Sequence, residues 1–149
     1  MIVADADTIP DETALTAAIE SCAGMVIYPF DRYRYLTPES VDLPIDDVIV
    51  EREFASSVGG MFVTTTGTYW RLGGQDERFS RWGHEDNAFW LAADTLAFVR
   101  RIPGTVYAFG HEADRDLSSE NPGMARRELY RFAHGRPELM RELIPEVKV

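Results

Sequence analysis

The stretch from residue 59 to residue 98 constrains the fold more than any other part of the chain. It begins with a glycine pair that opens a strand, continues through a second glycine pair at residues 73–74, and ends in a long apolar helix. A compact element stands directly before that helix, and it reads Trp82-Gly83-His84-Glu85-Asp86. This order of parts predicts a strand, a loop with fixed backbone turns, and two carboxylates in the first turn of a buried helix.

The charge of the chain is strongly acidic and unevenly distributed. The formal net charge is −10, and residues 1–58 hold 12 acidic and 3 basic side chains. Because binding to a phosphate backbone needs clustered lysine and arginine, this acidic half argues against a nucleic-acid partner. The length of 149 residues favours one domain.

No feature of the sequence indicates a membrane or an oxidising compartment. No apolar run approaches the ~20 residues of a membrane-spanning helix, and Met1 is followed by strand-like and acidic residues instead of a signal peptide. The single cysteine, Cys22, excludes a disulfide within the chain. We therefore expect a cytoplasmic protein without a transmembrane segment.

The first residues of the chain predict a strand–helix–strand unit. Residues 2–4 form a short apolar run, and residues 25–28 form a second one. Residues 11–23 between them predict a helix, whose apolar stripe consists of Leu15, Ala18, Ile19 and Cys22. Two strands joined by a helix at this spacing are expected to be parallel, with a right-handed crossover.

Apolar periodicity and turn residues divide the rest of the chain into further elements. We expect an irregular loop with at most one helical turn over residues 31–47, whereas residues 47–53 fit a strand or a helix. Strands are predicted at 60–66 and 105–109, a loop at 111–123, and helices at 68–72, 85–99, 125–134 and 137–143. The fold class is therefore α/β, with a mixed sheet flanked by helices.

Two carboxylates follow the first predicted strand, in the tripeptide Asp5-Ala6-Asp7. Ligands bind at the carboxyl ends of strands in open α/β sheets, and carboxylates spaced i, i+2 can bind a hard divalent cation. Asp-x-Asp is also common in turns, where an aspartate bonds to its own backbone. The tripeptide by itself is therefore compatible with a metal site or with a plain turn.

A second pair of carboxylates, Glu85 and Asp86, opens the predicted helix 85–99. The helix dipole keeps such carboxylates ionised, and neighbouring side chains on a helix point about 100° apart, so the two would have different roles. Acidic residues in a first helical turn also stabilise a helix for structural reasons alone, by ~0.3–1 kcal/mol. That explanation does not account for the preceding Trp82 and Gly83, which favour a functional site.

Two further residues are weaker candidates. His111 follows the predicted strand 105–109, and imidazole suits a transition metal, although a lone histidine is more often structural. Gly60 would let the backbone approach a bound ligand closely, or it would form a plain bulge.

Together these motifs resemble those of metal-dependent, nucleotide-sugar glycosyltransferases with the A-type fold, most closely the beta-galactosyltransferase and chondroitin-synthase group. Residues 3–10, Val-Ala-Asp-Ala-Asp-Thr-Ile-Pro, look like the Asp-x-Asp-x-Ile-Pro stretch of that group. The Trp-Gly-x-Glu-Asp element is similar to the family's acceptor site. The run from His111 to Asn121 is similar to the family's metal-binding histidine and the loop after it.

The resemblance implies a metal-dependent, inverting transfer of a hexose or N-acetylhexosamine. The donor would be a UDP-sugar, and the acceptor would be a hydroxyl of a carbohydrate or glycoprotein. Asp7 and His111 would hold Mn²⁺ or Mg²⁺, and Asp5 would serve the metal shell or the donor ribose. Some relatives carry a metal-ligating methionine three residues before this histidine, where this chain has Ala108.

The resemblance also implies roles for the other candidates. Asp86 would be the catalytic base, Glu85 would hydrogen-bond the acceptor sugar, and Trp82 would offer it an apolar face. Gly60 would lie close to the donor. This mechanism requires that folding brings Asp7, His111 and Asp86 to the rim of one cleft.

In that family the Asp-x-Asp strand follows a nucleotide-binding half, whereas here Met1 directly precedes the strand. The resemblance therefore implies a partial A-type fold that lacks the N-terminal nucleotide-binding half, which we expect a separate polypeptide to supply. Residues 1–123 would form the catalytic and acceptor-binding portion. Residues 124–149 would be a C-terminal helical extension of the same domain.

Two other functions fit some of the same motifs. A non-catalytic carbohydrate-binding or regulatory remnant of a glycosyltransferase would keep Trp82, Glu85 and Asp86 without turnover. A metal-dependent nucleotidyltransferase also uses paired aspartates, but it would not need the Trp-Gly-x-Glu-Asp element. Metal-dependent hydrolysis of a UDP-sugar distinguishes an active transferase from the remnant.

Overall fold

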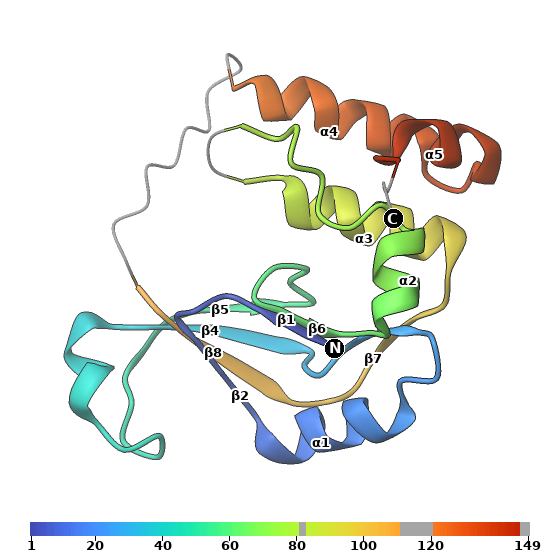
Figure 1. Cartoon of the computed structure of the whole chain (residues 1–149). Coiled ribbons are helices and arrows are strands. Elements are labelled where there is room, and N and C mark those ends of the chain that lie inside the picture. Colours follow the sequence, from blue (N-terminus) through green and yellow to red (C-terminus); the bar gives the residue numbers. More distant parts are fainter. Residues whose placement is uncertain (81–82, 111–120, 147–149) are drawn as a thin grey trace. The chain divides into compact units, whose positions relative to one another are not determined.

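The computed structural model describes residues 1–80, 83–110 and 121–146 (Figure 1). The chain divides into two compact units. The sheet unit contains Met1–Ala23, Ile27–Thr64 and Arg100–Glu112, and the helical unit contains Gly24–Val26, Thr65–Val99 and Ala113–Val149. The predicted α/β class is confirmed, with two sheets where the sequence analysis expected one.

The first sheet has four short strands in the order β1-β6-β3-β7. These strands are β1 (Ile2–Ala4), β6 (Met61–Val63), β3 (Val26–Tyr28) and β7 (Val99–Arg101). Both β1 and β3 pair antiparallel with β6, so β1 and β3 run parallel to each other, as predicted. The position of β6 between them was not predicted from the sequence.

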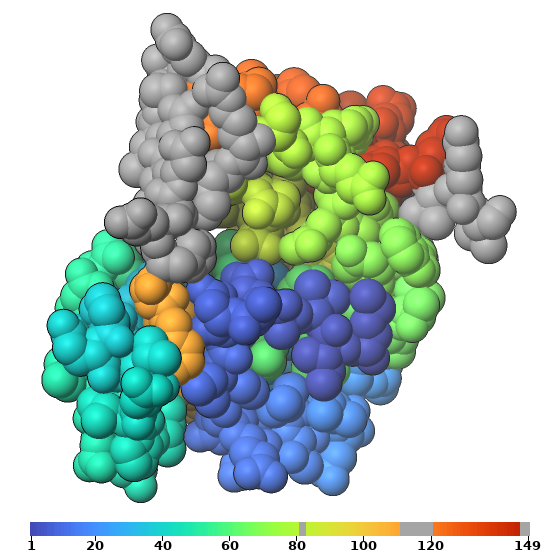
Figure 2. Space-filling view, turned by 60° about the vertical axis from the view of Figure 1, so that its left-hand side comes forward, coloured from blue at the N-terminus to red at the C-terminus, as the bar shows by residue number. Residues whose placement is uncertain are grey.

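The two central strands of this sheet are apolar along their whole length. Every residue of β3 and β6 is buried. A strand that is covered on both faces carries a continuous apolar run, which explains why Met61-Phe62-Val63 shows no alternation. The edge strand β1 is different, because Ile2 is 46% exposed. Figure 2 shows the N-terminal segment, in blue, at the surface.

The second sheet is mixed, with the strand order β2-β8-β4-β5. Its strands are β2 (Thr8–Pro10), β8 (Thr105–Phe109), β4 (Arg32–Leu36) and β5 (Val50–Ala55). β4 runs parallel to β8, whereas β2 pairs antiparallel with β8 and β5 pairs antiparallel with β4. β8 has the predicted bounds, and β5 shows that the undecided segment 47–53 contributes a strand.

β4 corrects the sequence analysis, which expected an irregular loop over residues 31–47. The segment contains β4 and then one short 3₁₀-helix, η1 (Pro38–Asp42), which is the single helical turn that was expected. β4 reads Arg-Tyr-Arg-Tyr-Leu, so charged and aromatic residues alternate. Tyr33 is buried, while Arg34 pairs with Glu53 on β5. Because charged residues on one face find partners across the strands, they do not prevent strand formation.

α1 (Glu12–Ser21) follows β2 and packs against β6. Asp11 caps its N-terminus, since Oδ1 accepts a hydrogen bond from the N–H of Ala14 at 2.9 Å. Ala14, Ala18 and Cys22 are buried, whereas Ile19 is 51% exposed. The predicted apolar stripe is therefore correct for Ala18 and Cys22 and wrong for Ile19.

The helical unit contains four helices in its described part, namely α2 (Thr66–Arg71), α3 (Glu85–Leu96), α4 (Pro122–Ala133) and α5 (Pro137–Leu143). α3, α4 and α5 pack against one another, and their buried core consists of Ala88, Leu91, Ala92, Tyr130, Ala133 and Met140. α5 has the predicted bounds. Within the ranges that the structure describes, no helix is both long and apolar enough to cross a bilayer.

The bounds of α3 and α4 differ from the predicted ones. α3 ends at Leu96 rather than at residue 99, and Val99 already belongs to β7. Both elements are apolar here, so periodicity alone does not locate the boundary between them. α4 begins at Pro122, because Asn121 caps it by accepting a hydrogen bond from the N–H of Gly123 at 2.8 Å.

Candidate functional site

The tripeptide Asp5-Ala6-Asp7 forms the turn between β1 and β2 in the sheet unit. The N–H of Asp5 donates to the carbonyl oxygen of Gly60 at 2.8 Å, and the hydroxyl of Thr8 donates to the carbonyl oxygen of Asp5 at 2.8 Å. The turn, which we call the acidic turn, is therefore fixed through its backbone. Its expected place at the carboxyl end of a strand is confirmed.

Gly60, whose carbonyl oxygen binds the N–H of Asp5, occupies a position where only glycine fits. Its φ of +97° favours glycine, and a Cβ atom at this position would overlap Cε2 of Tyr33. Tyr33 is buried, and burial raises the pKa of its hydroxyl; Tyr35, Asp5 and Asp7 add to the shift. Gly60 was predicted from the sequence as a site residue, but Tyr33 was not. The ring of Tyr33 occupies the space that a side chain at Gly60 would need.

We expect Gly60→Ala to destabilise the protein by about 3 kcal/mol, because the methyl group meets a buried ring at a backbone angle that disfavours it. The measurement is the free energy of unfolding in urea. Gly67→Ala in α2 is the matched control, since a Cβ at Gly67 meets nothing within 4 Å. Equal stability of the two variants would show that Tyr33 does not restrict this position.

The carboxyl end of β8 lies next to the acidic turn. Thr8 pairs with Ala108, and the N–H of Phe109 donates to the carbonyl oxygen of Asp7 at 3.0 Å. His111, the predicted second metal ligand, follows two residues after Phe109 and lies outside the described residues. In the described ranges, no group of three or more histidine, cysteine, aspartate or glutamate side chains could hold a metal ion.

Glu85 and Asp86 occupy the first turn of α3, as predicted. The chain enters the helix through two residues with positive φ, Gly83 at 93° and His84 at 81°. His84 stands at the N-cap but makes no side-chain capping hydrogen bond. The two carboxylates therefore supply negative charge at the N-terminus of the helix, where the helix dipole favours it. Trp82, the predicted apolar face for a sugar, lies outside the described residues.

The surroundings of His84 disfavour its charged form. Burial lowers its pKa below the ordinary value of 6.5, and the nearby Arg127 lowers it further, against smaller opposing effects of Glu85 and Glu128.

The two carboxylates of α3 have different surroundings. Asp86 Oδ1 accepts a hydrogen bond from Nε2 of Gln75 at 3.0 Å. Glu85 Oε2 is buried and finds no hydrogen-bond partner in the part of the chain that the structure describes. A buried carboxylate oxygen without a hydrogen bond is unusual, because buried polar atoms normally have a hydrogen-bond partner.

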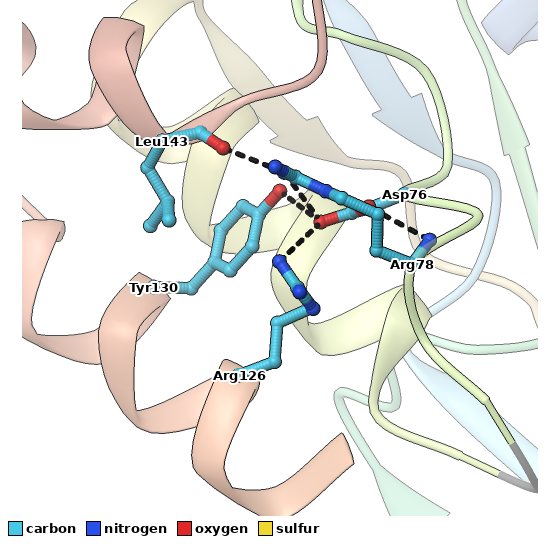
Figure 3. A network of polar contacts seen from close by, with 5 residues as sticks. All are labelled: Asp76, Arg78, Arg126, Tyr130 and Leu143. Carbon is cyan, nitrogen blue, oxygen red and sulfur yellow. Dashed lines mark hydrogen bonds and ion pairs between the residues drawn. The ribbon is translucent and has the colours of Figure 1, made fainter. Parts of the chain in front are cut away.

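A third carboxylate, Asp76, anchors the loop before α3 (Figure 3). Its side chain is 1% exposed and accepts hydrogen bonds from Nε of Arg78 at 2.7 Å and from the hydroxyl of Tyr130 at 2.9 Å. Arg126 lies 3.7 Å from Oδ2, and Arg78 also donates to the carbonyl oxygen of Leu143 at 2.7 Å. This network ties the loop to α4 and to the end of α5.

The charge of Asp76 is stabilised despite its burial. Burial is the largest single influence and raises the pKa, but the hydrogen bonds from Arg78 and Tyr130 together bring the pKa below its ordinary value. In the sequence, Asp76 was recognisable only as part of the motif before Trp82. Its structural role depends on α4 and α5, which lie far away in the sequence.

The predicted catalytic and metal-binding residues belong to different parts of the chain. Asp5, Asp7 and Gly60 lie in the sheet unit, Glu85 and Asp86 lie in the helical unit, and Trp82 and His111 lie outside the described residues. Folding brings Gly60 to Asp5 and Gln75 to Asp86. That Asp7, His111 and Asp86 meet at one cleft stays a prediction.

Comparisons with family models, with curated proteins and with solved structures find no match to this chain. The resemblance to glycosyltransferases thus stays a prediction from the motifs.

Proposed function

We propose that this chain is the acceptor-binding and catalytic portion of an inverting, metal-dependent glycosyltransferase. It would transfer a hexose or N-acetylhexosamine from a UDP-sugar to a hydroxyl of a carbohydrate or glycoprotein acceptor. The proposal joins the motifs of the sequence to the surroundings of the carboxylates at the start of α3 and of the acidic turn.

The observation that supports the proposal most is the state of Glu85. Its Oε2 atom is buried without a hydrogen-bond partner among the residues that the structure describes, directly beside Asp86. Leaving such a group unsatisfied costs about 1–3 kcal/mol or more. In the proposal, a hydroxyl group of the acceptor sugar donates a hydrogen bond to Oε2 and removes this cost.

In this proposal Asp86 is the catalytic base. As the acceptor oxygen forms its bond to the anomeric carbon, the bond between that carbon and the diphosphate oxygen breaks, and the diphosphate leaves with the electron pair. The carboxylate of Asp86 takes the proton of the acceptor hydroxyl. It stands in the first turn of α3, where the helix dipole favours negative charge. A single displacement of this kind inverts the anomeric configuration.

The acidic turn provides the kind of donor atoms that a divalent metal would need. Carboxylate oxygens of Asp5 and Asp7 suit Mg²⁺ or Mn²⁺, and a histidine nitrogen suits Mn²⁺ better than Mg²⁺. In the proposal Asp7 and His111 hold the metal, and Asp5 serves its shell or the donor ribose. When bound, the metal supplies positive charge that offsets the charge of the diphosphate.

We further propose that a separate polypeptide binds the nucleobase of the UDP-sugar donor. The support lies in β1, the outermost strand of the first sheet, with Met1 and Ile2 47% and 46% exposed. An edge strand with apolar side chains at the surface is able to pair with another strand.

The proposal is tested by hydrolysis of UDP-sugars, in which water takes the place of the acceptor. We expect release of UDP from UDP-hexoses or UDP-N-acetylhexosamines in the presence of Mn²⁺. Removal of the metal with EDTA should abolish the release, and added Mn²⁺ should restore it, because the diphosphate leaves poorly without a balancing charge. A CMP-sugar serves as the control donor.

The result that contradicts the proposal is binding of sugars without any metal-dependent turnover. Such a result would favour the non-catalytic carbohydrate-binding module instead. Retention of the anomeric configuration in a product would contradict the single displacement.

A further inference from the structure

Gln75 is a polar residue of the helical unit to which the sequence analysis assigned no role. It is the only glutamine of the chain, and its side-chain Nε2 donates to Oδ1 of Asp86 at 3.0 Å. The two are eleven positions apart in sequence. Their contact therefore depends on how the chain is folded around Gln75, and hydrogen bonds hold the residues on both sides of it.

The N-terminal side of Gln75 is held by α2. The backbone N–H of Gln75 donates to the hydroxyl of Tyr69 at 3.1 Å, and the N–H of Gly74 donates to the carbonyl oxygen of Tyr69 at 3.0 Å. Gly74 has a φ of +64°, and a Cβ there would press on the rings of Tyr69 and Trp70 at 3.1–3.2 Å. The ring of Tyr69 also lies 5.6 Å from that of Phe89 on α3. Tyr69 thus connects the turn to the helix that carries Asp86.

The C-terminal side of Gln75 is held just as firmly. The next residue is Asp76, whose side chain is 1% exposed and bonded to Arg78 and Tyr130. Gln75 is therefore placed between two anchors. Its side chain reaches Asp86 from a backbone that has little freedom to move.

The hydrogen bond from Gln75 to Asp86 has a definite direction. The side-chain N–H of Gln75 points at Oδ1, one of the two oxygens of the Asp86 carboxylate, at 3.0 Å. A planar amide held at its backbone on both sides restricts how that carboxylate can rotate.

We propose that Gln75 is a positioning residue, which holds the carboxylate of Asp86 in the direction from which it takes a proton from the acceptor hydroxyl. Tyr69 supports it by fixing the turn. The inference rests on the proposed function, because it assigns Gln75 to the base of that reaction. Misplacing a catalytic group by 1 Å can cost about 10²-fold in rate, so a positioning residue has a measurable effect.

The contact itself is tested without any activity. With ¹⁵N introduced only in glutamine, the side-chain amide of Gln75 gives the single pair of NH₂ signals of the chain. We expect Asp86→Ala to shift this pair and to speed its exchange with water, whereas Asp94→Ala, near the other end of α3, leaves it unchanged. An unchanged pair in the Asp86 variant overturns the inference.

The positioning role is tested by kinetics of Mn²⁺-dependent UDP-sugar hydrolysis. Gln75→Met keeps the length of the side chain and removes its N–H group, and we expect kcat to fall about 10–100-fold with little change in KM for the donor. Tyr69→Phe should lower kcat in the same sense but less. Glu77→Gln, on an exposed neighbour in the same loop, should keep the wild-type kcat.

The outcomes separate this inference from the function on which it rests. A wild-type kcat in Gln75→Met, together with loss of turnover in Asp86→Asn, overturns the role of Gln75 and leaves the function intact. Absence of turnover in the wild-type protein, both by itself and together with the polypeptide that would bind the nucleobase, overturns the function, and the role of Gln75 with it. If Gln75→Met fails to fold, the kinetics of Tyr69→Phe and the amide signals of the Asp86 variant decide the case.

Discussion

Replacing Asp86 with asparagine is expected to lower the turnover of a UDP-sugar by about 10³-fold, because the reaction loses its general base. Asparagine has nearly the same shape as aspartate, and its amide oxygen can still accept the hydrogen bond from Gln75. The variant should therefore fold normally. It should also bind Mn²⁺ as the wild type does, since the proposed ligands of the metal are Asp7 and His111.

The measurements are kcat and KM for Mn²⁺-dependent hydrolysis, the Kd for Mn²⁺, and thermal unfolding. Asp94→Asn is the matched control, because Asp94 is an exposed residue of the same helix that pairs with His134. Its turnover should stay close to that of the wild type. Turnover of Asp86→Asn at the level of this control would remove Asp86 from the role of base.

The second large effect is expected for Asp76→Ala, which should lower the free energy of unfolding by about 3 kcal/mol. The substitution removes the acceptor of the buried Tyr130 hydroxyl and the partner of Arg78. The loss stays moderate because Arg78 and Arg126 keep side chains that are 45% and 28% exposed and can bind water instead.

This loss should depend on pH in a defined direction. The pKa of Asp76 in the folded protein lies below the ordinary value of 3.8, so its stabilisation is fully present above that value and disappears as the pH falls through the folded-state pKa. Urea unfolding at several pH values should show a constant difference between wild type and Asp76→Ala from pH 7 to about 4, and a shrinking one below.

Two further variants test whether the loss of stability comes from the hydrogen-bond network of Asp76. Tyr130→Phe removes only one hydrogen bond and should cost about 1 kcal/mol. Glu77→Ala, on an exposed neighbour, should cost less than about 0.5 kcal/mol. If Asp76→Ala costs no more than Glu77→Ala, the network does not stabilise the loop.

The sequence predicted best those elements whose identity depends on local pattern. The apolar runs of β3 and β6 and the whole of β8 were found, because a buried strand shows in its own residues. The start of α3 was found for the same reason, since Glu85 and Asp86 stand directly before a long apolar segment. In each of these elements, a few neighbouring residues are enough to predict the structure.

Elements that depend on distant partners were missed. β4 contains two arginines and was assigned to a loop, although it forms a strand between β5 and β8, and β8 lies far along the chain. The contact of Gln75 with Asp86 and that of Tyr33 with Gly60 were missed for the same reason. A weak signal existed for β4, namely the alternation of arginine and tyrosine.

The outermost position of β5 has a consequence for how the protein behaves in a crowded solution. All six residues of β5 are exposed, and it is the last strand of its sheet. Its middle residues are Glu51, Arg52 and Glu53, so a foreign strand that docked there would have to desolvate three charges. Natural sheets use such charges to discourage aggregation, and here they protect an edge that also carries the exposed ring of Phe54.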